Sequence, residues 1–522
     1  MPQYDLPTYP QFGHVYPGDY YEQIPYDDYI RPDQPLPTGM PVFDIRDFGA
    51  VPSPDLLNTA SIRAAAAACE QAGGGVLLVT GGCYVTGTVF VPSNTVLFIT
   101  PDAELRASRN VSELTQADDA ASKERGTEAV GGALIMLKGK SNVTITGGGC
   151  INGQGEWFVY EPREFPIFEK ASAVQVPRRD QKAIINLVPG TQRYLVRQRI
   201  RYCEDKYGEG KPNLLRPAGM VWVQDCSNVR IENIILRDSM SWTLHIDCCD
   251  RVTVRDLVID DNRHVANADG IDVDGSADVL VEHCFISCSD DGLCVKNPAH
   301  TNRPTERITF RDCQVITVAN SFKIGTETRH DIHDVLVENC HFFMSDIYPG
   351  SVGGISIESC DGSHVSNVTV RNITMDGVLA PLYILLNRRN RYGAAYSDNP
   401  DATAWWGGSI RNVLIENIHA VNAEQPSIIT GFADQRPDGT PVRRPVQDIS
   451  IRGFQAEYRP CGENVEVPDV IPEFLTDYPE SNAHGDVDAC GIWARHADGL
   501  SLSGIEITPR PCNTRPLVVI HE

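Results

Sequence analysis

A short segment of the form Asn/Asp-Val-x-Val/Ile-x-Asn/Asp recurs from residue 228 onwards, and it restricts the possible folds more than any other feature. Its copies are NVRIEN, RVTVRD, DVLVEH, RITFRD, DVLVEN, NVTVRN, NVLIEN and DISIRG. Their second residues follow one another at steps of 23, 27, 29, 27, 33, 45 and 36 residues and are Val229, Val252, Val279, Ile308, Val335, Val368, Val413 and Ile449. Apolar and polar residues alternate within each copy, which predicts a short β-strand, and helical periodicity is nearly absent between copies. The pattern therefore indicates a β-repeat protein.

The repeat period separates two architectures made of stacked strands. A propeller blade needs about 40–45 residues for its four antiparallel strands, which the steps of 23 and 27 residues cannot supply. In a parallel β-helix each coil holds two or three short strands, and loops absorb the differences in coil length. We therefore predict an all-β fold, a right-handed parallel β-helix or solenoid, formed by a single domain over residues 43–522.

The open ends of such a stack need covering, because unpaired strand edges expose backbone groups. A short alanine-rich helix near Ile62 is predicted to cap one end. Asn58 or Thr59 would begin this helix, and the glycines at 73–75 would end it. The tail after Arg459 would cap the other end.

Three segments stand apart from the repeat. Residues 1–42 contain nine prolines and seven tyrosines, which predicts an extended arm. This arm would pack on the body, cover one end of a groove or join a second subunit in a homo-oligomer. Residues 155–216 and 388–410 are predicted to be long insertions between coils, and such loops on a rigid scaffold often shape binding sites.

Net charge and hydropathy exclude two classes of partner. The formal net charge of −24 argues against nucleic acid, whose phosphates require clustered Lys and Arg. No apolar run approaches the roughly 18 residues of a membrane span, so we expect no membrane partner. The first residues lack the basic and apolar regions of a secretory signal. We expect a cytoplasmic protein, or a secreted one if a leader has been trimmed.

The chain contains 16 cysteines, and several of them occupy one repeated position. The cysteines that each end a strand-like segment are Cys226, Cys284, Cys313, Cys340 and Cys360. We interpret them as stacked, buried, reduced thiols that behave as small apolar side chains. Disulfides and zinc are less favoured because the sequence has no paired C-x-x-C set.

The stretch NADGIDVDGSADVLVEHCFISCSDDGLCVK, residues 267–296, concentrates acidic side chains in two successive coils. Asp269 precedes the strand-like segment IDVD, and Asp290 and Asp291 precede LCVK. Asp290 lies 21 residues after Asp269. If 21 residues complete one coil, the carboxylates stand about 4.8 Å apart along the stack, apart from side-chain splay. We therefore expect the three aspartates to share one site.

Further polar side chains fall on the same face of neighbouring strands. Because alternate residues of a strand point to opposite sides, this face can be read from the sequence, and we expect it to point outwards. Its members are His245, Asp247, Asp272, Asp274, Cys294, Lys296, Lys323, Ser356 and Glu358.

Three neighbouring carboxylates suit the hydrolysis of a glycosidic bond. One carboxylic acid protonates the leaving oxygen, and a carboxylate activates water. Crowding among carboxylates keeps a proton on one of them near neutral pH. Taken singly, Asp290 and Asp291 could cap a turn, and Asp269 could accept bonds from backbone amides. The coincidence of all three at the spacing of one coil favours catalysis.

These residues support a resemblance to glycoside hydrolase family 28, the polygalacturonase-like family of right-handed parallel β-helices, from about Phe43 to the C-terminus. Asn267-Ala268-Asp269-Gly270 resembles the family's Asn-x-Asp motif, and Ser289-Asp290-Asp291-Gly292 resembles its Asp-Asp motif. DFGA, TGGGCINGQGEWF and SWTLHI are similar as well. The resemblance implies hydrolysis with inversion, in which Asp290 is the general acid and Asp269 and Asp291 hold and activate the water. Inversion predicts acid and base carboxyls about 6.5–9.5 Å apart.

Two motifs of the family are absent. Asn320 stands where the histidine of Gly-His-Gly is expected, and Ser356-Ile357-Glu358 replaces Arg-Ile-Lys. The resemblance assigns that basic pair to a galacturonate carboxylate, which Glu358 would repel. A neutral or differently placed sugar on the leaving-group side therefore stays open. The residues that we predict to bind substrate are His245, Asn267, Asp272, Lys296, Asn320, Lys323 and Glu358.

The sequence thus predicts an inverting, exo-acting glycoside hydrolase for a pectin-related or other plant oligosaccharide, with no cofactor and no metal. Two other functions on the same fold stay open. A polysaccharide lyase would bind Ca²⁺ through a cluster such as Asp272, Asp274 and Asp291 and would use an Arg or Lys as its base. A non-catalytic solenoid would bind carbohydrate without turnover.

Overall fold

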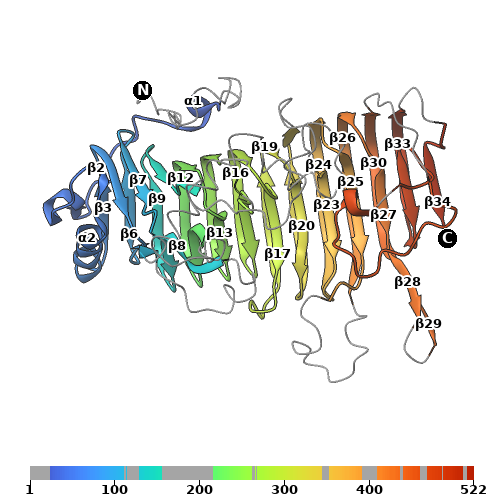
Figure 1. Ribbon diagram of the computed structural model, residues 1–522, viewed down its shortest axis with the longest axis horizontal. Helices are drawn as coiled ribbons and strands as arrows, with labels where there is room; N and C mark the ends of the chain where they lie inside the picture. Colours follow the sequence, from blue (N-terminus) through green and yellow to red (C-terminus); the bar gives the residue numbers. More distant parts are fainter. Residues whose placement is uncertain are drawn as a thin grey trace, which may run out of the picture. The chain divides into compact units, whose positions relative to one another are not determined.

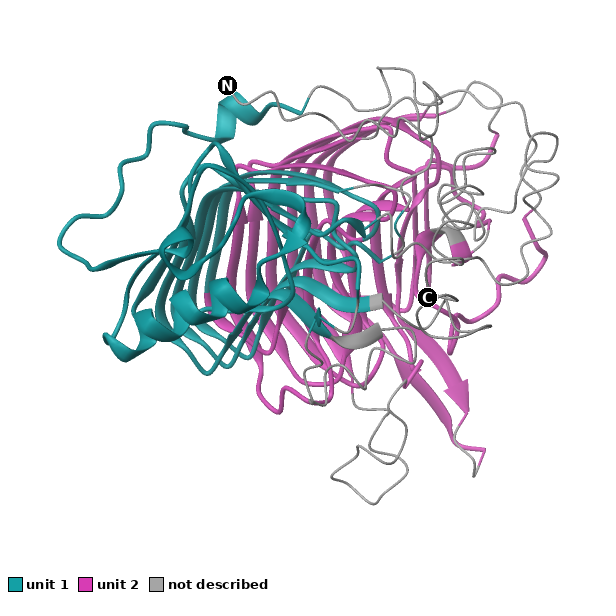
Figure 2. Ribbon diagram, turned by 60° about the vertical axis from the view of Figure 1, so that its left-hand side comes forward, with its two compact units in different colours: residues 1–272, 279–290 teal, residues 273–278, 291–522 magenta. Residues whose placement is uncertain are grey.

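The structure, a computed structural model, describes residues 24–110, 113–114, 129–155, 216–261, 265, 267–343, 352–390, 408–435, 439–458, 467–484, 486–509 and 514–522. The predicted insertions at 155–216 and 388–410 lie almost wholly outside these residues, as does the first part of the arm. The contacts divide the chain into two compact units, residues 1–272 with 279–290 and residues 273–278 with 291–522 (Figure 2). The prediction of one domain over residues 43–522 stays a prediction.

Unit 1 contains mostly short strands (Figure 1). Its elements are α1 (Tyr26–Tyr29), β1 (Val42–Asp44), the 3₁₀ helix η2 (Ile45–Phe48), β2 (Ser53–Leu57), α2 (Thr59–Gln71), β3 (Gly75–Val79), β4 (Gly82–Thr86), β5 (Val89–Phe90), β6 (Thr95–Ile99), β7 (Ala103–Ala107), β8 (Ala129–Lys138), β9 (Ser141–Thr146), β10 (Cys150–Asn152), β11 (Arg216–Gln224), β12 (Ser227–Arg237), β13 (Trp242–Asp247) and β14 (Asp250–Asp260). The next two strands, β15 (Ile271–Asp274) and β16 (Ala277–Cys288), have residues in both units.

Unit 2 also consists mainly of strands. Its elements are β17 (Leu293–Asn297), β18 (Thr305–Arg311), β19 (Gln314–Thr317), β20 (Asn320–Thr328), β21 (Ile332–Glu338), β22 (His341–Phe343), β23 (Gly353–Ser359), β24 (His364–Asp376), β25 (Ala380–Leu386), β26 (Ser409–Ala423), β27 (Ser427–Thr430), β28 (Phe432–Gln435), β29 (Pro441–Arg444), β30 (Val446–Tyr458), α6 (Ser481–His484), β31 (Ile492–Arg495), β32 (Ala497–Asp498), β33 (Ser501–Thr508) and β34 (Val518–His521).

Strands from successive coils pair in parallel within each unit. In unit 1, β5, β8, β11 and β13 pair in that order, while β1, β3, β6, β9, β12 and β14 form a second series. In unit 2, β17, β20, β23, β25, β27, β31 and β34 form one series, called here the β20 series, and β18, β21, β24, β26, β30 and β33 form another. The predicted parallel β-helix is confirmed.

The repeated segment of the sequence is the unit that stacks. In unit 1 the motif residue Val229 pairs with Val252. In unit 2 an unbroken row of motif residues pairs from coil to coil and consists of Ile308, Val335, Val368, Val413 and Ile449. All of these side chains are buried. The row shows that loops absorb the unequal steps between motif copies, because the register of the row does not change.

The polar ends of the motif are corners of the coil. The first and last residues of every copy have a left-handed backbone, with φ between 48° and 62°. Asn228 and Asn233 bound the first copy, and Asp448 and Gly453 bound the last. Asn and Asp tolerate this conformation better than other non-glycine residues. The preference of the motif for Asn and Asp at both ends therefore reflects backbone geometry.

Asparagine side chains at these corners also bond to one another between coils. In unit 2, Asn417 donates to Asn372 at 2.8 Å, and Asn372 donates to Asn339 at 3.0 Å. Another corner repeats this contact, since Asn412 donates to Asn367 at 2.6 Å. Each amide can donate to one neighbour and accept from the other, so an asparagine ladder follows the stacking direction.

The predicted capping helix is present as α2, which packs on β1, β3 and η2. Asn58 holds the N-cap position, but its side chain accepts from the Val51 amide instead of an amide of the helix. The Thr59 hydroxyl accepts from the Gly87 amide. The helix ends at Gln71, and the Gly74 amide, in a residue with φ of 127°, donates to the Cys69 carbonyl. No helix in the described part of the chain is long and apolar enough to cross a membrane.

The described part of the N-terminal arm packs on unit 1. Tyr29 stacks on His283 with ring centroids 4.7 Å apart, and Arg237 donates to the Tyr26 hydroxyl at 2.7 Å. Tyr26 also donates to Asp260. These contacts anchor residues 24–42 to their own chain. Association through the arm stays a prediction.

The cysteine interpretation is confirmed for the described residues, because every cysteine among them is free and nearly all are buried. Neighbouring coils bring thiols together, as where the Cys226 amide donates to the Cys249 sulfur at 3.4 Å. A hydrogen bond with the Cys313 thiol, together with burial, raises the pKa of Cys340 well above its usual value. Buried thiols of this kind add to the apolar interior as small side chains.

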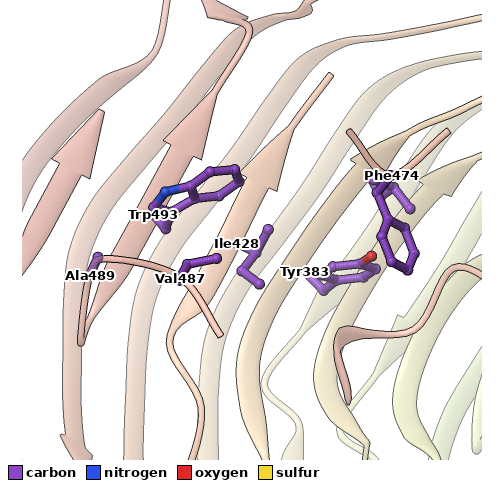
Figure 3. Close-up of a cluster of buried hydrophobic side chains, with 7 residues drawn as sticks. Tyr383, Ile428, Phe474, Val487, Ala489 and Trp493 are labelled. Atoms are coloured by element: carbon purple, nitrogen blue, oxygen red, sulfur yellow. The ribbon is translucent and has the colours of Figure 1, made fainter. Parts of the chain in front are cut away.

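A segment near the C-terminus covers one face of the β20 series. Within that series Lys323, Ser356, Tyr383, Ile428 and Trp493 are register partners, so they lie in one row on the same face. Side chains from residues 467–489 pack on this row (Figure 3) and form a buried cluster of Tyr383, Leu385, Ile428, Phe474, Val487, Ala489 and Trp493.

The polar face predicted to point outwards is buried, and that prediction is wrong. His245, Asp247, Asp272, Asp274, Cys294, Lys296, Lys323, Ser356 and Glu358 all have exposed fractions of 3% or less. Strand alternation identifies which side of a strand a residue occupies, but not whether another segment covers that side. For Lys323 and Glu358 in unit 2, the covering segment includes Glu480, which lies 3.9 Å from the Lys323 ammonium.

The asparagine ladder predicts a measurable contribution to stability. Asn372→Ala removes two hydrogen bonds of the ladder. It also places alanine, which has no polar side chain, in the left-handed backbone conformation. We therefore expect the free energy of unfolding to fall by about 1–3 kcal/mol. Asn372→Gly removes the same bonds but relieves the backbone, and it should lose less. Chemical unfolding followed by circular dichroism measures both variants. Equal losses would show that the left-handed backbone contributes nothing to the preference for asparagine.

Candidate active site

Two of the predicted catalytic aspartates meet in unit 1. Asp269 precedes β15 and Asp290 follows β16, and a carboxylate oxygen of one lies within 4.8 Å of a carboxylate oxygen of the other. Both side chains are buried, with exposed fractions of 3% and 4%. The spacing of 21 residues therefore corresponds to one coil, as predicted for this pair.

The loop that carries Asp269 is fastened to the loop that carries Asp290. The Asp290 and Ser289 amides both donate to the Ala268 carbonyl, at 3.2 and 3.1 Å, and the Ala268 amide donates to the Ser289 hydroxyl at 3.3 Å. Asn267, whose φ is 56°, donates through its side chain to Asp290 Oδ2 at 3.3 Å. Asn267 was predicted to bind substrate, and here it orients the Asp290 carboxylate.

A third acidic residue, Asp261, lies behind this pair and was not identified from the sequence. Its carboxylate accepts from the Thr243 hydroxyl at 2.5 Å and from the Ser239 amide at 2.7 Å. Burial raises the pKa of Asp261 to about 8, against these two hydrogen bonds, and the charges of Asp260 and Asp269 raise it further. Asp261 is therefore largely protonated at neutral pH.

Asp291, the third predicted catalytic residue, directly follows Asp290 in the sequence and belongs to unit 2. Asn320, at the start of β20, donates to Asp291 Oδ1 through its side chain at 2.8 Å and through its backbone amide at 3.2 Å. The ammonium of Lys323 lies 3.4 Å from Asp291 Oδ2. Both oxygens of this carboxylate thus face donors of β20.

Lys323 is surrounded by acidic groups of unit 2. Besides Asp291, its ammonium lies 3.9 Å from Glu358 Oε1 and 3.9 Å from Glu480 Oε1. Glu358 in turn accepts a hydrogen bond of 2.7 Å from the Ser356 hydroxyl. The side chains of Lys323 and Glu358 have no exposed surface. Their predicted contact with substrate stays a prediction.

The remaining predicted substrate residues are buried in their strands. His245 in β13 stacks on Trp222 at 5.3 Å and meets the edge of Trp242 at 4.9 Å between ring centroids. Asp272 lies in β15 and Lys296 in β17. The role of His245, Asp272 and Lys296 in substrate binding stays a prediction.

Two residues near the site carry no sequence signal. Glu480 and Tyr478 lie more than 150 residues after Lys323 and outside the repeat. Tyr478 contacts the Thr326 hydroxyl at 3.3 Å, and its ring centroid is 5.8 Å from the Lys323 ammonium. Only the packing of the segment over the β20 series reveals them.

The acidic pair does not by itself indicate a metal site. Ca²⁺ takes six to eight oxygen ligands, and two carboxylates supply a small part of such a set. Among the described residues, the groups of acidic side chains with mutually close ligand atoms include neither Asp272 nor Asp274. The cluster that a lyase would use is therefore not assembled there.

The separation of the two carboxylates bears on the predicted inversion. The nearest oxygens of Asp269 and Asp290 lie within 4.8 Å, whereas an inverting acid and base are expected about 6.5–9.5 Å apart. The spacing of this pair therefore gives no support to inversion.

The raised pKa of Asp261 predicts a pH-dependent contribution to stability. Its folded pKa of about 8 lies above an unfolded value of about 3.9, so this contribution is complete below about pH 4 and is lost as the pH rises through 8. The asparagine of Asp261→Asn does not titrate. As the pH rises from 4 to 8, the free energy of unfolding of this variant should therefore increase relative to that of the natural protein, by on the order of 1 kcal/mol per pH unit. Unfolding free energies between pH 4 and 9 test this.

The exposed corner residue Asp312 provides the control for this measurement. Asp312→Asn makes the same chemical change at an exposed position where asparagine also suits the backbone, with a φ of 55°. Its difference from the natural protein at each pH gives the baseline for the Asp261→Asn comparison. If the difference in unfolding free energy between Asp261→Asn and the natural protein did not change with pH, Asp261 would not be protonated in the folded protein.

Comparison with known proteins adds an independent line of evidence. The family model of glycosyl hydrolases family 28 matches residues 202–440, which include the acidic pair and β20. A probable polygalacturonase of Vitis vinifera is 24% identical over 391 residues, covering 71% of this chain and 68% of that protein.

Two solved structures share the fold over most of the chain. A hyperthermoactive exopolygalacturonase from Thermotoga maritima has a TM-score of 0.59 at 18% identity and covers 92% of this chain and 94% of its own. A family 28 exopolygalacturonase of Yersinia enterocolitica has a TM-score of 0.60 at 17% identity, with coverage of 92% and 77%. With the acidic motifs in place on a parallel β-helix, the part of this chain that the family model matches, residues 202–440, is similar to the glycoside hydrolases of family 28.

Proposed function

We propose that the protein removes terminal sugars from a pectin-related oligosaccharide by hydrolysis with inversion, using Asp269, Asp290 and Asp291. The observation that carries this proposal is the buried Asp269–Asp290 pair, which the loops around Ala268 and Ser289 fasten together. Hydrolysis of a glycosidic bond needs a carboxylic acid and a carboxylate at one place, and this pair brings two carboxyl groups together.

The resemblance of the two aspartate motifs to those of the family suggests the role of each residue. Asp290 gives its proton to the glycosidic oxygen as the bond from that oxygen to the anomeric carbon breaks. Water attacks the anomeric carbon and loses its proton to Asp291, while Asp269 helps to hold the water. The reaction leaves Asp290 ionised and Asp291 protonated, and a proton exchange with solvent restores the starting state.

The substrate class follows from what the neighbouring coil lacks. The basic pair that the resemblance assigns to a galacturonate carboxylate is replaced by Ser356 and Glu358, which bond to each other at 2.7 Å. Neither side chain offers a positive charge. We therefore propose a neutral sugar on the leaving-group side of the scissile bond, within an oligosaccharide that is pectin-related elsewhere.

Exo action is proposed from two observations. Both solved structures compared above are described as exopolygalacturonases, which supports the proposal at the level of the fold. The long N-terminal arm and the insertions at 155–216 and 388–410 provide chain that could close the ends of a groove.

The central prediction is that Asp290→Asn abolishes turnover. Purified protein should release reducing sugar from pectic oligosaccharides, and Asp290→Asn should lower that rate at least about 100-fold, because loss of a general acid removes about 10²–10⁴-fold of the rate. Asp312→Asn, an exposed corner change, is the matched control and should keep full activity. Circular dichroism checks that both variants fold.

The products separate this proposal from its alternatives. Exo action predicts one small product from the first minutes, while the viscosity of a polymer falls slowly. A rapid fall in viscosity would contradict exo action. Products that absorb in the ultraviolet, together with activity lost to a chelator, would indicate a lyase, and sugar binding without turnover in any assay would indicate a non-catalytic solenoid.

The stereochemical outcome is a separate prediction. Inversion requires that the new reducing end first appears with the anomeric configuration opposite to that of the cleaved bond. Proton NMR during the first minutes, before mutarotation equilibrates the anomers, measures this directly. Initial product of the same configuration as the cleaved bond would establish retention instead, in keeping with the short distance between Asp269 and Asp290.

A further inference from the structure

Lys323 is a lysine without any exposed surface beside a proposed catalytic carboxylate. It lies in β20, and its ammonium is 3.4 Å from Asp291 Oδ2. Removing an ammonium from water is unfavourable by several kcal/mol unless nearby charges compensate. A buried lysine in this position therefore indicates a specific electrostatic partner.

The groups that face Lys323 come from three parts of unit 2 and are acidic or phenolic. Asp291 precedes β17, Glu358 lies in β23, and Tyr478 and Glu480 belong to the segment after β30. Burial lowers the pKa of Lys323, but Asp291, Glu358, Tyr478 and Glu480 together hold it well above its usual value. The side chain is therefore a cation at every working pH.

Among these neighbours, Asp291 is the main partner of the cation at neutral pH. Burial raises the pKa of Glu358 to about 8, against the opposing effects of Lys323 and the hydrogen bond from Ser356. Glu358 is thus mostly protonated at neutral pH. The distance to Asp291, 3.4 Å, is also shorter than the 3.9 Å to Glu358 and to Glu480.

Asn320 completes the contact with Asp291. It donates twice to Oδ1, at 2.8 Å from the side chain and 3.2 Å from the backbone, while Lys323 faces Oδ2. Asn320 and Lys323 belong to one strand, so their spacing is fixed by β20 itself. The two hydrogen bonds hold one oxygen in place, and a cation near the other oxygen stabilises the ionised form of the carboxylate.

We propose that Lys323 is a positioning residue that keeps Asp291 ionised and correctly turned to accept the proton of the attacking water, and that it does not bind a substrate carboxylate. This inference rests on the function proposed above for Asp291. It gives the cation in β20 a different role from the one predicted from the sequence, because its charge is already matched by buried acidic groups.

The first test is the pH dependence of kcat/KM for Lys323→Met and Lys323→Arg. Without the cation, Asp291 should take up a proton more readily, so the acid limb of the Lys323→Met profile should move up by about one pH unit or more. Its maximal rate should fall at least about 10-fold. Lys323→Arg keeps the charge and should leave the acid limb near its original position.

Two results would overturn the proposal. One is a folded Lys323→Met protein whose activity falls while its acid limb does not move, which would indicate a purely structural role. The other is a rise in KM confined to uronate-bearing substrates with an unmoved limb, which would make Lys323 a substrate contact.

A second test does not depend on activity and so separates failure of this inference from failure of the proposed function. The difference in unfolding free energy between the natural protein and Lys323→Met should vary with pH on the acid side of neutrality, because removal of the cation changes how readily Asp291 takes up a proton. In an Asp291→Asn background the variation should disappear. If it persists there, Lys323 does not act through Asp291.

Lys323→Met alone leaves buried carboxylates without their cation and could fail to fold. In that case the double variant Lys323→Met with Asp291→Asn decides the question, since it removes both members of the pair. Recovery of a folded protein supports the coupling of these two residues, and continued failure to fold contradicts it. If the natural protein hydrolyses no glycan, the proposed function fails while these stability measurements still test the pair.

Discussion

The left-handed corners of the coils are the constraint on which the rest of this structure depends. Each copy of the repeated motif begins and ends with such a corner, and between the two corners the strand places its apolar side chains inside. In unit 2 the corners repeat without a change of register from Ile308 to Ile449. Because unequal loops leave this register intact, residues far apart in sequence reach fixed positions on neighbouring strands.

The same constraint explains which parts of the site could be predicted. The asparagine and aspartate residues at corners, together with alternation inside the motif, are enough to predict stacked parallel strands. Once a coil is recognised, the 21 residues from Asp269 to Asp290 predict that the two carboxylates lie one strand spacing apart. In the structure their nearest oxygens lie within 4.8 Å. The burial of the polar face could not be predicted in this way. Alternation assigns Lys323 and Glu358 to one side of a strand but contains no information on what covers that side.

What covers that side in unit 2 is a segment outside the repeat. Residues 467–489 pack their apolar side chains on Tyr383, Ile428 and Trp493, and the same segment brings Glu480 towards Lys323. Its sequence shows no periodicity linked to the coils, so its partner could not be inferred. Tertiary packing thus converts a row that looks solvent-exposed in the sequence into a buried cluster of charges.

The departures from the family's motifs are best understood as a single change in where positive charge is placed. Lys323 and Ser356 are register partners on adjacent strands, so the cation of β20 lies one strand away from the position at which the resemblance expects a basic residue. In β23 the resemblance assigns a basic residue to the sugar, whereas in β20 the cation lies 3.4 Å from Asp291. Glu358, protonated at neutral pH, then adds no net charge to the interior. The cation of β20 thus faces a carboxylate of its own unit, whereas in β23 the Ser356 hydroxyl donates to the carboxyl group of Glu358.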